Sequence, residues 1–141
     1  MKMFKDGANR TWMLSINLAS IKAVRAILNI DLMDANDGKV FKSLSDPCTM
    51  ADVLFVLCKQ DADKLSITDT DFGSALSGDV FENACNAFWD EWVEFFPLSK
   101  RQLLTKFLNK MKEYQNEKLA EVTEAIEKLE LPSSTKNIQV A

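Results

Sequence analysis

Polar and apolar residues alternate over residues 11–18, near the start of the chain. One side of this pattern holds Trp12, Leu14, Ile16 and Leu18, and the other holds Thr11, Met13, Ser15 and Asn17. Side chains alternate between the two faces of a β-strand, so this segment is predicted to be a half-buried strand. Residues 30–33 are a second short apolar run, which we expect to pair with the first as a hairpin. Between the two, Ser20 is expected to cap a helix that ends near Asn29.

Apolar residues recur at helical spacing from residue 46 onward. Asp46 followed by Pro47 is typical of a helix start, because Asp caps the helix and Pro suits its first turn. This helix is expected to bury an apolar face made of Met50, Val53, Leu54, Leu57 and Cys58. Thr68 and Asp71 repeat the capping signal before a short helix that passes through Leu76.

Two further helices complete the expected fold. The first covers about residues 79–96, is the most apolar in the chain and ends at Pro97. Ser99 and Gln102 then form a capping-box pattern, which predicts a long helix that runs to about residue 130. We therefore predict an α+β fold dominated by helices, with a short N-terminal strand or hairpin, about five helices and a long C-terminal helix.

The apolar stripe of the long C-terminal helix changes along its length. Its first half is dense, as in a helix that packs on a core, and contains Leu103, Leu104, Phe107, Leu108 and Met111. Its second half narrows to a coiled-coil-like seam of about two heptads, formed by Leu119, Val122, Ile126 and Leu129. Two heptads are marginal alone, so we expect this seam to pack on another helix, in the same chain or in a neighbour. We predict one helical domain over residues 1–131 and a flexible tail over residues 132–141.

The composition fits a packed globular chain. Of its 141 residues, 47% are hydrophobic, with four glycines and three prolines, which is far from the composition of disordered or collagen-like chains. The three cysteines are unclustered and lie in apolar stretches, so we interpret them as reduced core residues. The sequence has no run of ~20 apolar residues for a membrane span and no signal-peptide run at its start. We expect a cytoplasmic protein with no membrane partner.

Charge is distributed unevenly along the chain. The net charge of -4 argues against nucleic-acid binding, which requires clustered basic residues. Residues 61–94 contain nine acidic residues and one lysine, whereas residues 99–118 contain six basic and two acidic residues. The basic row on the final helix comprises Lys100, Arg101, Lys106, Lys110 and Lys112. This row is either a solvated helix face or a surface that pairs with an acidic helix, including that of another copy in a homo-oligomer.

Residue types that carry common chemistry are missing from the sequence. It contains no histidine, no CxxC pair and no glycine-rich phosphate loop. Asp34, Asn36 and Gly38 resemble the start of a calcium-binding EF-hand loop. The glycine falls one position too early, however, and Ser45 stands where such a loop has its bidentate glutamate. Asp90 and Glu94 are four residues apart on one helical face, which is typical of a solvated acidic face rather than an acid/base pair. We expect no enzymatic activity, no cofactor and no metal.

The most unusual segment is an aromatic run in the helix predicted over residues 79–96. Phe88, Trp92 and Phe96 are spaced four apart, as expected for the buried face of a helix. Trp89 and Phe95 fall on other faces, and tryptophan is enriched at the centres of protein interfaces. Two interpretations remain open for this run, a core row and a set of partner anchors.

Several segments from residue 12 to residue 104 together resemble one family. They are residues 12–17 (WMLSIN), 21–25 (IKAVR), 30–32 (IDL), 46–47 (DP), 52–55 (DVLF), 71–72 (DF), 76–79 (LSGD) and 95–97 (FFP). In this order they resemble small proteins encoded among the tail genes of tailed phages and prophages, described as tail assembly chaperones. The likeness covers roughly two thirds of the chain, and none of the segments is a diagnostic motif.

The resemblance implies a helical protein that acts in the host cytoplasm. Such a protein coats the long helical tape-measure protein and keeps it soluble until the tail tube polymerises around it. The first anchors expected for this client are Phe88, Trp89, Trp92, Phe95 and Phe96, with Lys100, Arg101, Lys106 and Lys110 beside them. Two alternatives remain open: a structural virion component such as a connector or decoration protein, and a small regulatory or anti-defence protein that binds a host target.

Overall fold

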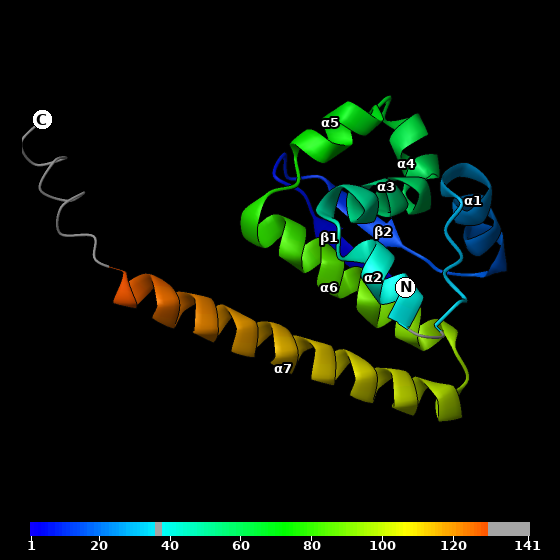
Figure 1. Cartoon of the computed structure of the whole chain (residues 1–141). Coiled ribbons are helices and arrows are strands. Elements are labelled where there is room, and N and C mark those ends of the chain that lie inside the picture. Colours follow the sequence, from blue (N-terminus) through cyan, green and yellow to red (C-terminus); the bar gives the residue numbers. More distant parts are fainter. Residues whose placement is uncertain (36–37, 130–141) are drawn as a thin grey trace, which may run out of the picture. The chain divides into compact units, whose positions relative to one another are not determined.

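The computed structural model describes residues 1–35 and 38–129, and it shows an α+β fold dominated by helices (Figure 1). In chain order the elements are β1 (Lys2–Lys5), β2 (Thr11–Leu14), α1 (Leu18–Leu28), α2 (Lys39–Leu44), α3 (Pro47–Leu57), α4 (Lys59–Lys64), α5 (Asp69–Ser74), α6 (Gly78–Phe95) and α7 (Leu98–Lys128). The predicted fold class is confirmed. The described residues form seven helices rather than about five, because α2 and α4, each six residues long, were not expected.

The chain divides into two compact units. The N-terminal unit covers Met1–Pro97, and the α7 unit begins at Leu98. The single domain expected over residues 1–131 stays a prediction. The tail expected over residues 132–141 belongs to the part of the chain that the structure does not describe.

The N-terminal unit begins with an antiparallel hairpin of β1 and β2. Phe4 faces Trp12 across the two strands, and Met3 faces Met13. Phe4, Trp12 and Leu14 are buried, whereas Met3 and Met13 are exposed, so the expected alternation is confirmed for residues 11–14.

Three details predicted for residues 11–33 were wrong. The strand ends at Leu14, because Asn17 caps α1 and its side chain accepts the backbone N–H of Ser20. Ser20 is thus the third helical residue of a capping box rather than the cap itself. Residues 30–33 are not a strand, since Asp31 turns the backbone by accepting the N–H of Met33 at 3.0 Å. Their expected place beside β2 is taken by β1.

Local capping explains most of the other helix boundaries. Asp46 accepts the backbone N–H of Cys48, with Pro47 in the first turn, and Thr68 forms a capping box with Asp71, as predicted. Ser99 does not cap α7, because the helix already begins at Leu98, immediately after Pro97.

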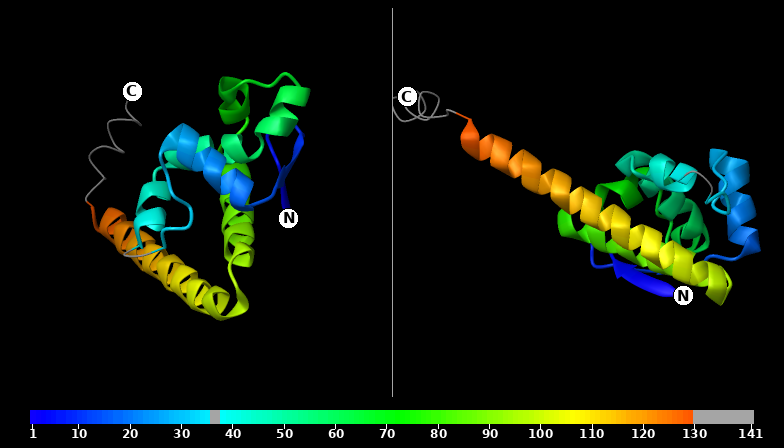
Figure 2. Two further views of the ribbon diagram at one scale, coloured as in Figure 1. Left: turned by 90° about the vertical axis from the view of Figure 1, so that its right-hand side faces the viewer. Right: turned by 60° about the horizontal axis from the view of Figure 1, so that its bottom comes forward.

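The core of the N-terminal unit lies around α6. This helix packs on both strands of the hairpin, and α1 packs on α3 (Figure 2). The largest fully buried side chains are Trp12, Trp92, Phe72, Phe88, Leu14, Ile21, Leu32, Met50 and Leu54. Among the cysteines, Cys58 is buried and Cys85 is half-buried, but Cys48 is exposed, which contradicts its expected place in the core. Cys48 is the second residue of α3 and lies in its first turn.

The α7 unit consists, as far as the structure describes it, of one helix of 31 residues. Leu104 is its one buried residue in the described range. Every residue from 112 to 129 is exposed. Within the described ranges, no helix combines the length and the apolar character that a membrane span requires.

Candidate functional site

The aromatic residues proposed as partner anchors divide into two groups. Phe88 and Trp92 have no exposed surface, and Phe96 is 3% exposed. The indole Nε1 of Trp92 donates a hydrogen bond of 2.7 Å to the carbonyl oxygen of Leu32. A side chain enclosed in this way has no surface for a partner, so these three rings act as core in this conformation.

Trp89 and Phe95 keep part of their surface exposed. Trp89 stacks on Phe41 of α2, with ring centroids 4.9 Å apart and an angle of 17° between the rings. Phe95 meets Phe96 edge to face at 5.2 Å. Both are half-buried rings in aromatic contacts within the N-terminal unit, so only part of each ring is accessible to a partner.

The basic residues proposed beside these anchors all lie on α7. Lys100, Lys106 and Lys110 are exposed, and Arg101 is half-buried. Lysine side chains on a helix surface are ordinarily solvated, and exposed charges contribute little free energy to a contact on their own. They can nevertheless select the orientation of a charged partner.

A row of exposed apolar side chains runs along the second half of α7. We call it the α7 seam and define it as Leu119, Val122, Ile126 and Leu129. Their exposed fractions are 65%, 53%, 52% and 59%. All four lie on one face of the helix at coiled-coil spacing. Clustered apolar side chains that remain this exposed are typical of a surface that another molecule covers. The α7 seam is therefore the strongest candidate site in the described part of the chain.

Charged residues surround the α7 seam without interrupting it. Lys118 pairs with Glu121 at 3.4 Å, and Lys128 pairs with Glu124 at 2.9 Å. Both pairs are exposed and lie within about one helical turn, so they contribute little to stability. They leave the apolar stripe free to accept a second helix.

A second apolar surface lies on the outer face of the hairpin. Met3 and Met13 are cross-strand partners that are 63% and 41% exposed, and Met1 precedes them on the same strand face. Methionine is flexible and adapts to irregular partners. Sequence reasoning missed this surface because it treated the first ten residues as a polar leader, although Phe4 and Met3 already alternate there.

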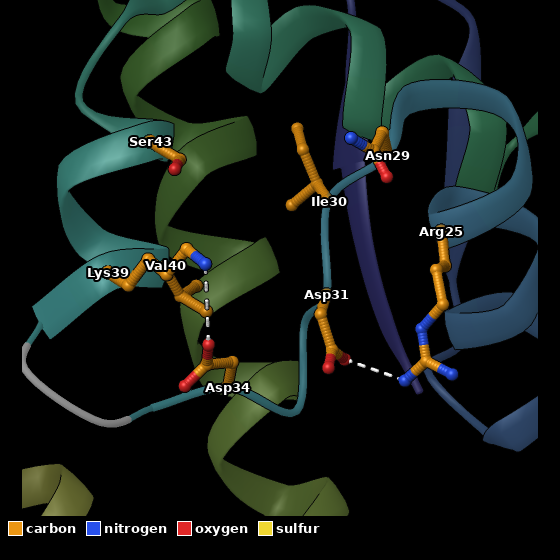
Figure 3. A pocket seen from close by; sticks show the side chains of 8 residues that line it. All are labelled: Arg25, Asn29, Ile30, Asp31, Asp34, Lys39, Val40 and Ser43. Carbon is orange, nitrogen blue, oxygen red and sulfur yellow. Dashed lines mark hydrogen bonds and ion pairs between the residues drawn. The ribbon is translucent and has the colours of Figure 1, made fainter.

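The polar pocket between α1 and α2 was also missed. It has a volume of about 350 Å³ and is lined by Arg25, Asn29, Ile30, Asp31, Asp34, Lys39, Val40 and Ser43 (Figure 3). Arg25 pairs with Asp31 at 2.9 Å, and Lys39 lies 3.8 Å from Asp34. The hydrogen bond from Arg25 holds the pKa of Asp31 below its usual value. Both cations of the lining thus face carboxylates, so the pocket has no surplus charge with which to select an ion.

Glu91 is the one buried carboxylate on α6 in the described residues. Its Oε2 accepts the backbone N–H of Ile16 at 3.1 Å, and its Oε1 lies 2.7 Å from the α-amino group of Met1. These contacts connect α6 to the residue before β1 and to the segment after β2, so the role of Glu91 is structural. On the same helix, Glu94 pairs with Lys2 at 2.9 Å, and Asp90 is exposed. This arrangement is that of a charged helix face rather than an acid/base pair.

The described residues contain no group of three or more His, Cys, Asp or Glu side chains that is arranged to hold a metal ion. Comparisons with family models, with curated protein sequences and with solved structures gave no match.

Proposed function

We propose that this protein is a non-enzymatic protein-binding factor in phage virion assembly, a tail assembly chaperone that keeps a tape-measure protein soluble. The observation that carries the binding role is the α7 seam, whose four apolar side chains are each more than half exposed. The assignment to phage tails rests on the sequence resemblance alone.

The geometry of α7 suits a helical client. A client helix with its own apolar stripe packs against the α7 seam as knobs into holes, so that both stripes leave water together. Every residue from 112 to 129 is exposed, so this segment is accessible along its whole length. The main contact with the client thus moves from the aromatic run of α6 to α7. Trp89 and Phe95 remain as half-buried candidates for additional contacts.

The proposal is tested by co-expression with a fragment of a phage tape-measure protein. We expect the client to be soluble with the wild-type chain and to precipitate without it. The double variant Val122→Glu with Ile126→Glu should lose this effect, because it places two carboxylates on the α7 seam.

A matched control carries the same charge change elsewhere on α7. Asn116 and Ala120 are also four residues apart and exposed, but they lie on another side of the helix. Asn116→Glu with Ala120→Glu should therefore keep the client soluble. A client that is equally insoluble with and without the wild-type chain would contradict the proposal. Mass spectrometry of purified particles addresses the structural alternative, because an assembly factor should be scarce in them.

A further inference from the structure

The charges of α7 are ordered along the helix. Residues 98–112 contain five basic and no acidic residues, which gives a net charge of +5. Residues 113–129 contain five acidic and two basic residues, which gives a net charge of -3. Basic residues near a helix N-terminus are unfavourable for the helix itself, because that end carries the positive pole of the dipole. The dipole of α7 therefore does not account for this order.

The apolar face of α7 is symmetric about Gln115. Steps of four, three and four residues toward the C-terminus reach Leu119, Val122 and Ile126. The same steps toward the N-terminus reach Met111, Leu108 and Leu104. A helix with this spacing can match a reversed copy of itself, since a two-fold axis through Gln115 superimposes the two halves.

We propose that α7 pairs antiparallel with α7 of a second copy of this chain, with the two-fold axis at Gln115. This pairing places the basic half of each helix beside the acidic half of the other. A parallel pair would instead place like charges side by side along both halves, which is unfavourable. The charge order thus favours a second copy of α7 as the partner and the antiparallel orientation of the pair.

The exposed residues of α7 can supply this contact. In the antiparallel register, Ile126 of one copy lies level with Leu103 and Leu104 of the other, and Val122 lies level with Phe107 and Leu108. Leu108 and Met111 are half-buried and Phe107 is 37% exposed, so these residues offer the apolar surface that the partner's α7 seam can contact. Leu103 lies about 120° around the helix from this face and points away from it. Leu104 is buried within its own chain and is not part of the proposed contact.

The length of α7 also favours pairing along the whole helix over pairing through the α7 seam alone. The four seam residues span about two heptads, which is marginal for a stable pair. The 31 residues of α7 extend over about 46 Å at 1.5 Å per residue. At the centre, the two Gln115 side chains meet at the two-fold axis, where their amides can hydrogen-bond to each other. A single polar pair in an apolar seam fixes register in coiled coils.

Self-pairing does not depend on the identity of any client. It covers the α7 seam when no other helix does, so a client that uses the same seam must displace the second copy. Failure of one interaction is therefore measured separately from failure of the other: the mass of the purified protein reports self-pairing, and client solubility reports the proposed function.

The first experiment measures the mass of the full chain in solution by sedimentation equilibrium. We expect twice the mass of the 15.9 kDa chain and a dissociation constant that rises several-fold with salt, because opposite charges are screened. Val122→Glu with Ile126→Glu should weaken the dimer at least about tenfold, whereas Asn116→Glu with Ala120→Glu should change it by less than about twofold. A wild-type chain that remains at 15.9 kDa at about 100 μM would overturn the proposal.

The second experiment tests the direction of the pair by disulfide formation, with exposed Cys48 replaced by serine. A chain with Met111→Cys mixed with a chain with Leu119→Cys should cross-link to a heterodimer, because the two positions lie level only in the antiparallel pair. Efficient cross-linking of the Leu119→Cys chain with itself, with no heterodimer formed in the mixture, would show a parallel pair and refute the proposed one. The far-ultraviolet circular dichroism of each variant checks that the helices are retained.

Discussion

The carboxylate of Asp6 accepts the indole N–H of Trp12 at 2.9 Å, inside the loop that joins the two strands of the hairpin. The same carboxylate accepts the backbone N–H of Ala8 and of Arg10, each at 2.9 Å, and the guanidinium Nε of Arg10 at 2.7 Å. One buried side chain thus closes the β1–β2 loop and fixes the orientation of a core tryptophan. It shows how a polar residue can be central to the core of a small unit.

Replacing Asp6 with alanine should destabilise the N-terminal unit by about 3 kcal/mol, because it leaves a buried indole N–H and two backbone N–H groups without their acceptor. Chemical unfolding in urea, followed by tryptophan fluorescence, measures this loss. The matched control is Asp63→Ala, since Asp63 is exposed and pairs with Lys59 in an ordinary surface pair. We expect that control to change the free energy of unfolding by less than about 0.5 kcal/mol. Similar losses in the two variants would contradict the role of Asp6.

The stability of the N-terminal unit should fall in acid because of the same residue. Burial raises the pKa of Asp6, but the hydrogen bonds from Trp12 and Arg10 outweigh this effect and hold its pKa below the usual value of an aspartate. A carboxylate with a lowered pKa in the folded state stabilises the fold above its unfolded pKa and loses that contribution as pH falls through the folded pKa.

The urea midpoint of the wild type should therefore decrease as pH falls from about 4 toward 2. In an Asp6→Asn variant this part of the decrease should be missing, although other carboxylates still contribute. The comparison of the two pH profiles isolates the contribution of Asp6. Parallel profiles for the two chains would show that Asp6 binds protons equally in the folded and unfolded states.

The two tryptophans of the aromatic run should differ in their contribution to stability. Trp92→Phe removes the N–H that donates to the Leu32 carbonyl at 2.7 Å and leaves a gap where the indole is fully buried. We expect a loss of about 2 kcal/mol or more from these two effects. Trp89→Phe makes the same chemical change at a half-buried ring that stacks on Phe41, so its cost should be clearly smaller. Urea unfolding of both variants measures the two losses in the free energy of unfolding. Equal losses would contradict the expectation that Trp92 contributes more than Trp89.

The three cysteines should react with thiol reagents at very different rates. Cys48 is exposed, whereas burial raises the pKa of Cys58 to about 12 and that of Cys85 to about 11. The thiolate is the reactive form, so at neutral pH both raised thiols are almost entirely unreactive. We expect one rapidly labelled thiol in the native protein and three after unfolding in urea. Mass spectrometry of peptides would identify Cys48 as the rapid site, and rapid labelling at Cys58 would contradict the structure.

The elements that were predictable from sequence are those with a local cause. The caps at Asp46 and Thr68 act within a few residues and were identified correctly, as was the alternation around Trp12 over residues 11–14, although the predicted strand extended to residue 18. The pairing partner of β2 was not identified, because the two lysines of β1 made it resemble a polar leader, whereas residues 30–33 looked like a short apolar strand. The choice between them depends on contacts with α6 and on the local turn at Asp31.

The candidate site was predictable in part for the same reason. The spacing of Leu119, Val122, Ile126 and Leu129 already indicated a coiled-coil seam, and periodicity is a local property. The buried rings of the aromatic run, Phe88, Trp92 and Phe96, were predictable from their spacing of four. The buried role of Glu91 was missed, because its partners Ile16 and Met1 are far away in the sequence.

The exposure of residues 112–129 means that this half of α7 has little tertiary packing to maintain its helical backbone. Isolated helices of this length are only marginally stable in water. Any molecule that covers the α7 seam therefore also supplies the free energy that orders the segment, and the backbone amides beneath it become protected from solvent exchange at the same time. Binding to the α7 seam and helix formation in residues 112–129 are thus coupled. Substitutions that change only the helix propensity of residues facing away from the α7 seam should therefore change the affinity for the partner, although these residues do not contact it.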